Sequence, residues 1–179
     1  MKDNRVLLGF SGGIDSFAAV GLLQAAGYHV TALTLDMRGD SALLEKARLR
    51  AGTLGIPWRM RSVRERFERE VVDYFTDSYF RGRTPAPCTR CNSRIKWPCL
   101  AAEADALGIR YIATGHYFRI TSAGGKRYVT RAADNRKDQS YYLWDLPQEI
   151  LDRVLTPMGT VIKRNIVDGL SLIHISEPT

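Results

Sequence analysis

Short apolar runs alternate with longer amphipathic segments along most of the chain. Three runs rich in aliphatic and β-branched residues predict buried strands at residues 6–10, 28–35 and 110–114. Three segments with helical patterning, each followed by a glycine, predict helices at residues 16–26, 41–54 and 91–107. This alternation of strand and helix predicts an α/β fold built on a doubly wound, mostly parallel sheet.

Weaker patterns complete the predicted architecture. Five apolar residues at helical spacing predict the core face of a third helix: Val63, Phe67, Val71, Tyr74 and Phe75. Shorter elements are predicted as a strand at 58–62, a small hairpin from 117–120 and 126–130, and a last helix at 147–155. Ser41 is the predicted N-cap of the helix at 41–54, and two prolines break the chain between residues 81 and 87.

Composition and charge narrow the class of protein. A chain of 179 residues with 45% hydrophobic residues is long enough for one domain with its own core. No apolar run is long enough to span a bilayer, and the N-terminus does not read as a signal peptide. With three cysteines and no disulfide framework, these features predict a cytoplasmic protein without a membrane partner. A net charge of +7 and a segment at 81–96 with five cations and no acid favour an RNA partner.

The strongest chemical signal is the sequence SGGIDS, which joins the first predicted strand to the first predicted helix. Such a turn aims backbone N–H groups and a helix N-terminus at one point, which suits a pyrophosphate. Gly12 and Gly13 allow close backbone approach, and Ser11 and Ser16 add hydroxyl donors. Asp15 would repel phosphate unless a metal such as Mg²⁺ lay between them. No GxxxxGK[ST] or GxGxxG sequence occurs; the loop resembles the PP-loop of ATP pyrophosphatases.

The segment TPAPCTRCN at residues 84–92 is the second signal. Its CxxC lacks the further ligands of a zinc site, and it does not follow a strand as in a thioredoxin-like protein. The remaining readings are a structural cysteine or a reactive thiol. Cys91 is predicted at a helix N-terminus beside Arg90 and Arg94, and both features favour a thiolate. Cys99 is predicted to be a core residue.

Two further segments carry polar residues at positions where a ligand or RNA could bind. ATGHY at 113–117 puts Gly115 and His116 at the end of a predicted strand, where open α/β sheets bind ligands. A packing role for His116 is the alternative. KDQSYYL at 137–143 follows a basic run and is a plausible RNA contact, although by itself it reads as a charged turn.

Taken in order, SGGIDS, TPAPCTRCN, ATGHY and KDQSYYL closely resemble the tRNA-uridine 2-thiolase family from about residue 5 to about residue 168. The resemblance implies ATP-dependent 2-thiolation of the wobble uridine of tRNA. Uridine O2 would attack the α-phosphate of ATP, and sulfur from a cysteine persulfide would then displace AMP. The implied cofactors are ATP and Mg²⁺, and the implied partners are tRNA and a persulfide donor protein.

The resemblance also assigns roles residue by residue. Cys91 is the implied catalytic cysteine, which attacks the base or releases sulfur by forming a disulfide with a second, downstream cysteine. The ATP contacts fall on Gly9, Phe10, Ser11, Gly12, Gly13, Ile14, Asp15, Ser16, Leu35 and Gly115. The target-base contacts fall on Ala86, Pro87 and Cys88, and the other tRNA contacts on His116, Lys137, Asp138 and Gln139. Sulfur carried by a metal cluster is an open alternative to the persulfide.

The chain also departs from the family pattern. Ala86 replaces the usual Asn, and Cys88 stands where some members carry Asp. Members of the family are longer, and their second cysteine falls beyond residue 179. Residues 169–179 match nothing expected of the family and resemble translated adapter DNA, so we predict a catalytic domain at 1–168 followed by a foreign tail. We expect such a chain to bind ATP without completing sulfur transfer.

Two other functions stay open from the sequence. One is another PP-loop adenylating enzyme, such as an amidotransferase or a tRNA lysidine synthetase; the cysteine and KDQS segments argue against it. The other is a non-catalytic nucleotide-binding or redox-sensing module. Release of pyrophosphate from ATP that depends on tRNA would separate these functions from the thiolase.

Overall fold

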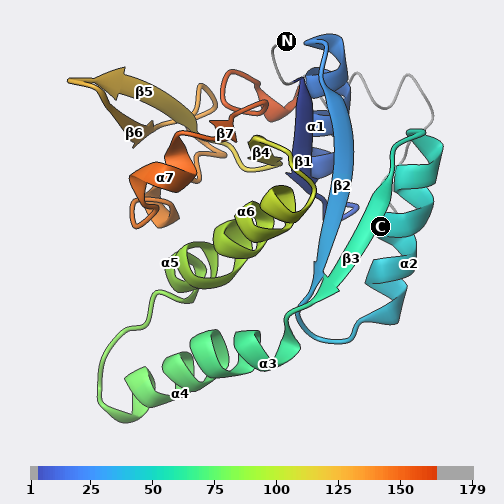
Figure 1. Ribbon diagram of the computed structural model, residues 1–179. Coiled ribbons are helices and arrows are strands. Elements are labelled where there is room, and N and C mark those ends of the chain that lie inside the picture. The colour runs from blue at the N-terminus through green and yellow to red at the C-terminus, as the bar shows by residue number, and fades with distance from the viewer. Residues whose placement is uncertain (1–3, 165–179) are drawn as a thin grey trace.

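A five-stranded parallel sheet with strand order β3-β2-β1-β4-β7 forms the centre of the molecule (Figure 1). The computed structural model describes residues 4–164, so the tail predicted at 169–179 lies outside the described residues. The strands are β1 Arg5–Gly9, β2 His29–Asp36, β3 Trp58–Ser62, β4 Tyr111–Thr114 and β7 Val154–Leu155. The predicted α/β fold with a parallel sheet is confirmed.

Helices cover both faces of this sheet. Helices α1 (Ile14–Ala25) and α2 (Ser41–Thr53) pack on one face, and α6 (Trp97–Ala106) packs on the other. Successive residues of β1 point to opposite faces: Val6 and Leu8 belong to the cluster under α1 and α2, whereas Leu7 belongs to the cluster under α6. Residues Val6, Leu7 and Leu8 of the strand are therefore all apolar and buried, which is why this part of β1 reads as a continuous run.

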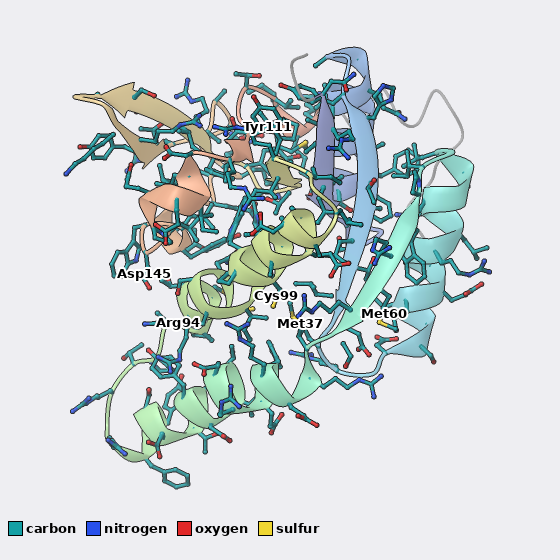
Figure 2. All side chains as sticks on the ribbon, viewed as in Figure 1. Met37, Met60, Arg94, Cys99, Tyr111 and Asp145 are labelled. Carbon is teal, nitrogen blue, oxygen red and sulfur yellow. The ribbon has the colours of Figure 1, made fainter. Side chains whose placement is uncertain are left out.

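Strand β3 lies at one edge of the described sheet. Its central residues Arg59, Met60 and Arg61 are exposed, and Figure 2 shows Met60 on this side of the molecule. Arg59 Nε lies 2.9 Å from a carboxylate oxygen of Glu103 on α6, and Arg61 Nη1 lies 3.4 Å from the other. One carboxylate thus holds two cations beside the open edge.

A helical arm extends beyond the sheet (Figure 1). It consists of α3 Arg64–Phe67, the π turn η1 Glu68–Val72 and α4 Asp73–Phe80. Val63 and Val71 are buried as predicted, but the prediction for Phe75 was wrong: its side chain is 41% exposed and contacts the Tyr79 ring edge-on. These residues are helical as predicted, but α4 extends beyond the hydrophobic core, so Phe75 is not covered.

The next helix begins earlier than predicted. Its segments are α5 Pro87–Cys91, the π turn η2 Asn92–Lys96 and α6. Proline is favoured in a first turn, where its missing N–H has no partner to lose, so the helix begins at Pro87 and not at Cys91. The π turn precedes Pro98, whose ring would clash with the Arg94 carbonyl in a regular α-helix.

Three smaller outcomes concern caps and ends. The hairpin is confirmed as antiparallel β5 Arg119–Ala123 and β6 Lys126–Thr130. The N-cap of α2 is Asp40 and not Ser41, because its Oδ1 accepts a hydrogen bond from the Leu43 N–H at 2.9 Å. The last predicted helix is shorter: η3 Ser140–Tyr142 and α7 Gln148–Leu151 precede β7, whose two residues pair with β4. Within residues 4–164 no helix is long and apolar enough to cross a membrane.

Candidate active site

The main cavity, of about 890 Å³, opens at the carboxyl ends of β1, β2 and β4. The chain winds outward from β1 through β2 to β3 and then returns to place β4 on the other side of β1. The winding direction therefore reverses between the neighbouring strands β1 and β4. Open α/β sheets bind ligands at the carboxyl end of such a reversal point. The cavity lies beside this reversal point.

The PP-loop (residues 9–16) forms one wall. Gly12 adopts a φ of +72°, and the Ser16 Oγ donates to the Gly13 carbonyl at 3.0 Å. The first-turn N–H groups of the twelve-residue helix α1 have no partner within the helix and make its N-terminus suited to an anion. Gly115 packs against this turn so closely that a Cβ atom there would lie 2.8 Å from the Ser16 nitrogen.

A second hollow of about 430 Å³ adjoins the loop on the side of α2. Gly12 and Gly13 line it together with Lys46, an α2 residue to which the sequence assigned no role. One turn further along α2, Arg50 donates a hydrogen bond to the Gly12 carbonyl. Helix α2 therefore holds the loop through Arg50 and adds the cationic side chain of Lys46 to the lining of the hollow beside it.

Asp15 is already paired within the chain. One carboxylate oxygen accepts the Tyr117 hydroxyl at 2.8 Å, and the other lies 3.0 Å from Lys163 Nζ. Burial and the Asp15 carboxylate raise the pKa of Tyr117, so its hydroxyl stays protonated. Each carboxylate oxygen of Asp15 thus has one partner within the chain, and each keeps a second lone pair. Lys163 supplies the positive charge for which the sequence suggested a metal.

The two cavity-lining cysteines differ in exposure. Cys88 is exposed, whereas only 8% of Cys91 is accessible, and Cys91 packs with Ile95 and Cys99. Figure 2 shows Cys99 in the space between α6 and the helical arm, near Met37. Both Cys88 and Cys91 line the cavity, and Cys99 does not.

The expected thiolate at Cys91 is a wrong prediction. Because the helix begins at Pro87, Cys91 lies in its second turn, away from the N-terminus. The Arg90 guanidinium is turned toward Glu70 and the Tyr74 ring instead of the thiol. Burial raises the pKa of the Cys91 thiol, and the positive charge of Lys96 offsets this only in part. Cys91 is therefore a buried thiol that favours its protonated form in this structure.

His116 lies on the cavity wall as a neutral imidazole. Its Nδ1 lies 2.8 Å from the Thr114 hydroxyl, and its ring stacks over Trp97. Burial, followed by the charge of Lys96, lowers its pKa to about 3. Both readings of His116, as a packing residue and as a ligand contact, agree with this placement.

The KDQ segment, for which the sequence predicts an RNA contact, has a structural role within the chain. Asp138 accepts hydrogen bonds from the Ala132 N–H and the Ser140 hydroxyl, both at 2.7 Å. Gln139 holds both backbone groups of Tyr117, through its own N–H and its side-chain oxygen. Lys137 is exposed. The segment thus fixes the loop that carries Tyr117 beside Asp15.

The cavity brings together most, but not all, of the residues predicted for the site. It is lined by Gly9, Phe10, Ser11, Asp15, Ser16, Leu35, Pro87, Cys88, Cys91, Gly115, His116 and Gln139. Ile14 is buried in the core, and Ala86, Lys137 and Asp138 lie outside the cavity lining. Among the residues that the structure describes, no group of three His, Cys, Asp or Glu is arranged to hold a metal ion.

Comparison with known proteins now identifies the family. The model of the tRNA methyl transferase HUP domain matches residues 4–175. The chain belongs to this family. The chain is 49% identical over 165 residues to tRNA-specific 2-thiouridylase MnmA 1 of Bacteroides fragilis, covering 90% of this chain and 45% of that protein. It is 40% identical over 178 residues to MnmA of Carboxydothermus hydrogenoformans, with 90% and 49% covered.

These matches confirm the resemblance drawn from the four motifs. The chain spans about half the length of the curated relatives it matches. Two solved structures share the fold at low identity. One is described as a predicted subunit of tRNA methyltransferase from Methanocaldococcus jannaschii, with TM-score 0.60, 17% identity, and 94% of this chain and 75% of that chain covered. The other is the NH3-dependent NAD synthetase of Campylobacter jejuni, with TM-score 0.58, 18% identity, and 99% and 67% covered.

Sequence reasoning missed two charged residues at this HUP-domain site. Lys163 follows Asp15 by 148 positions, and no local pattern joins them. Asp36 ends β2 and lines the cavity; it is buried, and its carboxylate accepts bonds from Arg64 and from the Gly39 N–H. The Arg64 guanidinium lowers the pKa of Asp36. A carboxylate at the end of a buried strand was a signal for this second residue.

Proposed function

We propose that this chain is the ATP-dependent catalytic domain of a tRNA-uridine 2-thiolase. The observation that carries the proposal is that a single cavity is lined by the PP-loop, Cys91 and His116. Adenylation and sulfur attack on one base require an anion site and a thiol within reach of the same atom. The relatives named tRNA-specific 2-thiouridylase support this substrate class.

The residues around the PP-loop fit the triphosphate of ATP. The first-turn N–H groups of α1 have no partner within the helix and are free to bind a phosphate. Gly12 and Gly13 have no side chains, so a phosphate can approach the backbone there. Lys163 neutralises Asp15, so its carboxylate does not repel the phosphates. Leu35 and Gly115 line the cavity where the adenosine contact is proposed. Mg²⁺ belongs to the proposal together with ATP, and the Asp15 carboxylate, which lines the cavity, is the protein group that would hold it beside the phosphates.

The proposed reaction has two stages in this cavity. Uridine O2 attacks the α-phosphate of ATP, and pyrophosphate departs into the donors of the PP-loop. Sulfur from a cysteine persulfide then attacks the activated carbon, and AMP leaves. Cys91 lines the same cavity, and the neutral His116 offers the base a hydrogen-bonding neighbour without adding charge.

The proposed tRNA contacts divide into two groups. Pro87, Cys88 and His116 line the cavity, which supports their proposed contact with the target base. Ala86 and Lys137 are exposed beside it, whereas Asp138 and Gln139 act mainly by holding their loop. The predicted persulfide donor protein and cytoplasmic location belong to the same proposal.

Pyrophosphate release tests the proposal. The chain, ATP and an unmodified tRNA with a wobble uridine are expected to release pyrophosphate, and a tRNA with cytidine at that position is the matched control. Ser11→Ala removes a hydroxyl donor at the loop and is expected to slow the release. Release that ignores tRNA would contradict the thiolase, while tight ATP binding without any turnover would favour a nucleotide-binding module.

A further inference from the structure

Two cysteines face one cavity from the same helical turn. Cys88 and Cys91 are three residues apart in α5, and both line the main cavity. A helix with a radius of about 2.3 Å and a rise of about 1.5 Å places the Cα atoms of such residues about 5 Å apart. A disulfide requires a Cα separation of about 4.4–6.8 Å. The backbone therefore holds these two thiols at a distance that a disulfide can bridge.

Cys99 is not an equivalent partner. It lies eight residues after Cys91, which corresponds to about 12 Å along a helix axis. Its sulfur lies 3.6 Å from Arg66 Nη1, and it is buried away from the cavity lining. All three cysteines are free in this structure. Any disulfide formed at the cavity is therefore expected to join Cys88 and Cys91.

The two thiols differ in a way that suggests an order of reaction. Cys88 is exposed and can meet a donor protein, whereas Cys91 is almost enclosed. Burial raises the pKa of the Cys91 thiol, so a smaller fraction of it is thiolate and it reacts more slowly. An incoming sulfur therefore reaches Cys88 first.

We propose that Cys88 and Cys91 are a sulfur-releasing pair, in which Cys88 accepts sulfur from a persulfide and Cys91 expels it as hydrosulfide into the cavity. This goes beyond the proposed function, which places the second cysteine downstream. It rests on that function only for the fate of the hydrosulfide.

The chemistry balances without a further oxidant. The Cys88 thiolate attacks the outer sulfur of the donor persulfide, a new S–S bond forms on Cys88, and the donor thiolate leaves. Cys91 then loses its proton to water in the cavity and attacks Cys88 Sγ. The Cys88–Cys91 disulfide forms, the bond to the outer sulfur breaks, and hydrosulfide departs. The outer sulfur gains two electrons and the two cysteines lose two; a dithiol reductant restores the pair.

Trypsin offers a direct readout, because Arg90 lies between the two cysteines. Cleavage places Cys88 in the peptide 84–90, Cys91 in 91–94 and Cys99 in 97–110. The whole chain is reduced, freed of reductant and given glutathione persulfide as the sulfur donor, without ATP or tRNA. We expect release of one sulfide per chain and a disulfide-linked pair of peptides 84–90 and 91–94.

Three substitutions separate the roles. In Cys91→Ser, peptide 84–90 is expected to gain the mass of one sulfur atom while sulfide release is lost. In Cys88→Ser, both the sulfide and the linked peptides are lost. Cys99→Ser is the matched control and is expected to behave as the parent chain does. The linked peptides in the parent need no substitution, so the test does not depend on the folding of a variant.

Two results would overturn the pair: a link between peptides 91–94 and 97–110, or undiminished sulfide release in Cys88→Ser. Because the assay omits ATP and tRNA, its failure leaves the pyrophosphate assay untouched. Conversely, a chain that releases sulfide but never pyrophosphate would refute the thiolase and keep the pair.

Discussion

At the scale of single residues, the site depends on how its charges are compensated. Asp15 stands at the start of α1, where a phosphate is proposed, and its charge is balanced by Lys163 and a hydrogen bond from Tyr117. His116 carries no charge at neutral pH. The PP-loop wall of the cavity therefore presents backbone donors and the compensated carboxylate of Asp15 to an incoming anion.

Removing the Lys163 charge is expected to weaken ATP binding. In Lys163→Ala, Asp15 faces the phosphates uncompensated, and we expect a loss of about tenfold in affinity, or about 1.4 kcal/mol. Lys163→Arg keeps the charge and serves as the control. Isothermal titration of ATP measures both variants. Equal affinities for Lys163→Ala and the parent chain would show that Asp15 does not interact with the nucleotide.

His116 is expected to make stability depend on pH. Its pKa is about 3 in the folded chain and 6.5 in an ordinary environment, so between these values the unfolded state binds more protons. The free energy of unfolding therefore falls as pH falls from 6.5 toward 3, by at most about 1.4 kcal/mol per pH unit. Denaturant titrations across this range measure the slope. His116→Asn should flatten it; an unchanged slope would assign the effect to other groups.

At the scale of elements, the boundaries decide the chemistry. A helix that began at Cys91 would have placed that thiol at its N-terminus. The helix begins at Pro87 instead, so Cys91 lies in the second turn. The sequence pattern located the helix without its first turn, because proline reads as a breaker although it is suited to the first helical position. The two-residue strand β7 was missed because it is too short for a period of two to be visible.

The cap of α2 provides a test at this scale. Asp40→Ala removes the acceptor of the Leu43 N–H and is expected to lower the free energy of unfolding by about 1 kcal/mol. Ser41→Ala, at the position that the sequence favoured, is expected to stay within about 0.5 kcal/mol of the parent. Urea denaturation compares the two variants. A larger loss in Ser41→Ala would return the cap to Ser41.

At the scale of the whole molecule, the position of the site follows from the topology. The alternation of apolar runs and amphipathic segments was enough to predict a parallel sheet, and motifs at strand ends pointed to the edge of the sheet where the main cavity opens. Contacts between distant segments were not predictable: Lys163 reaches Asp15 from near the end of the described chain. Such pairs follow from the packing of loops, which leaves no periodic trace in the sequence.

Gly115 packs the end of β4 against the first turn of α1. A Cβ there would meet the backbone of Ser16 at 2.8 Å, so Gly115→Ala should push α1 from the end of β4. We expect a loss of about 2 kcal/mol of stability together with weaker ATP binding. Gly21→Ala is the matched control. Gly21 lies within α1, and a Cβ atom there would meet nothing within 4 Å. This substitution should stabilise the chain by about 0.5–1 kcal/mol. Denaturant unfolding and ATP titration report both effects; a fully stable Gly115→Ala would contradict the close packing.

The edge strand β3 has a consequence for association between molecules. A bare strand edge is a template onto which another chain adds, and such additions lead to aggregates. Within residues 4–164 no strand pairs with the outer edge of β3, and its exposed Arg59 and Arg61 share one counterion, Glu103. A second molecule approaching in register would bring two more arginines against them, so like charges would repel before backbone bonds formed. The cations of β3 thus protect the sheet from self-templated growth, a benefit unrelated to nucleotide or sulfur chemistry.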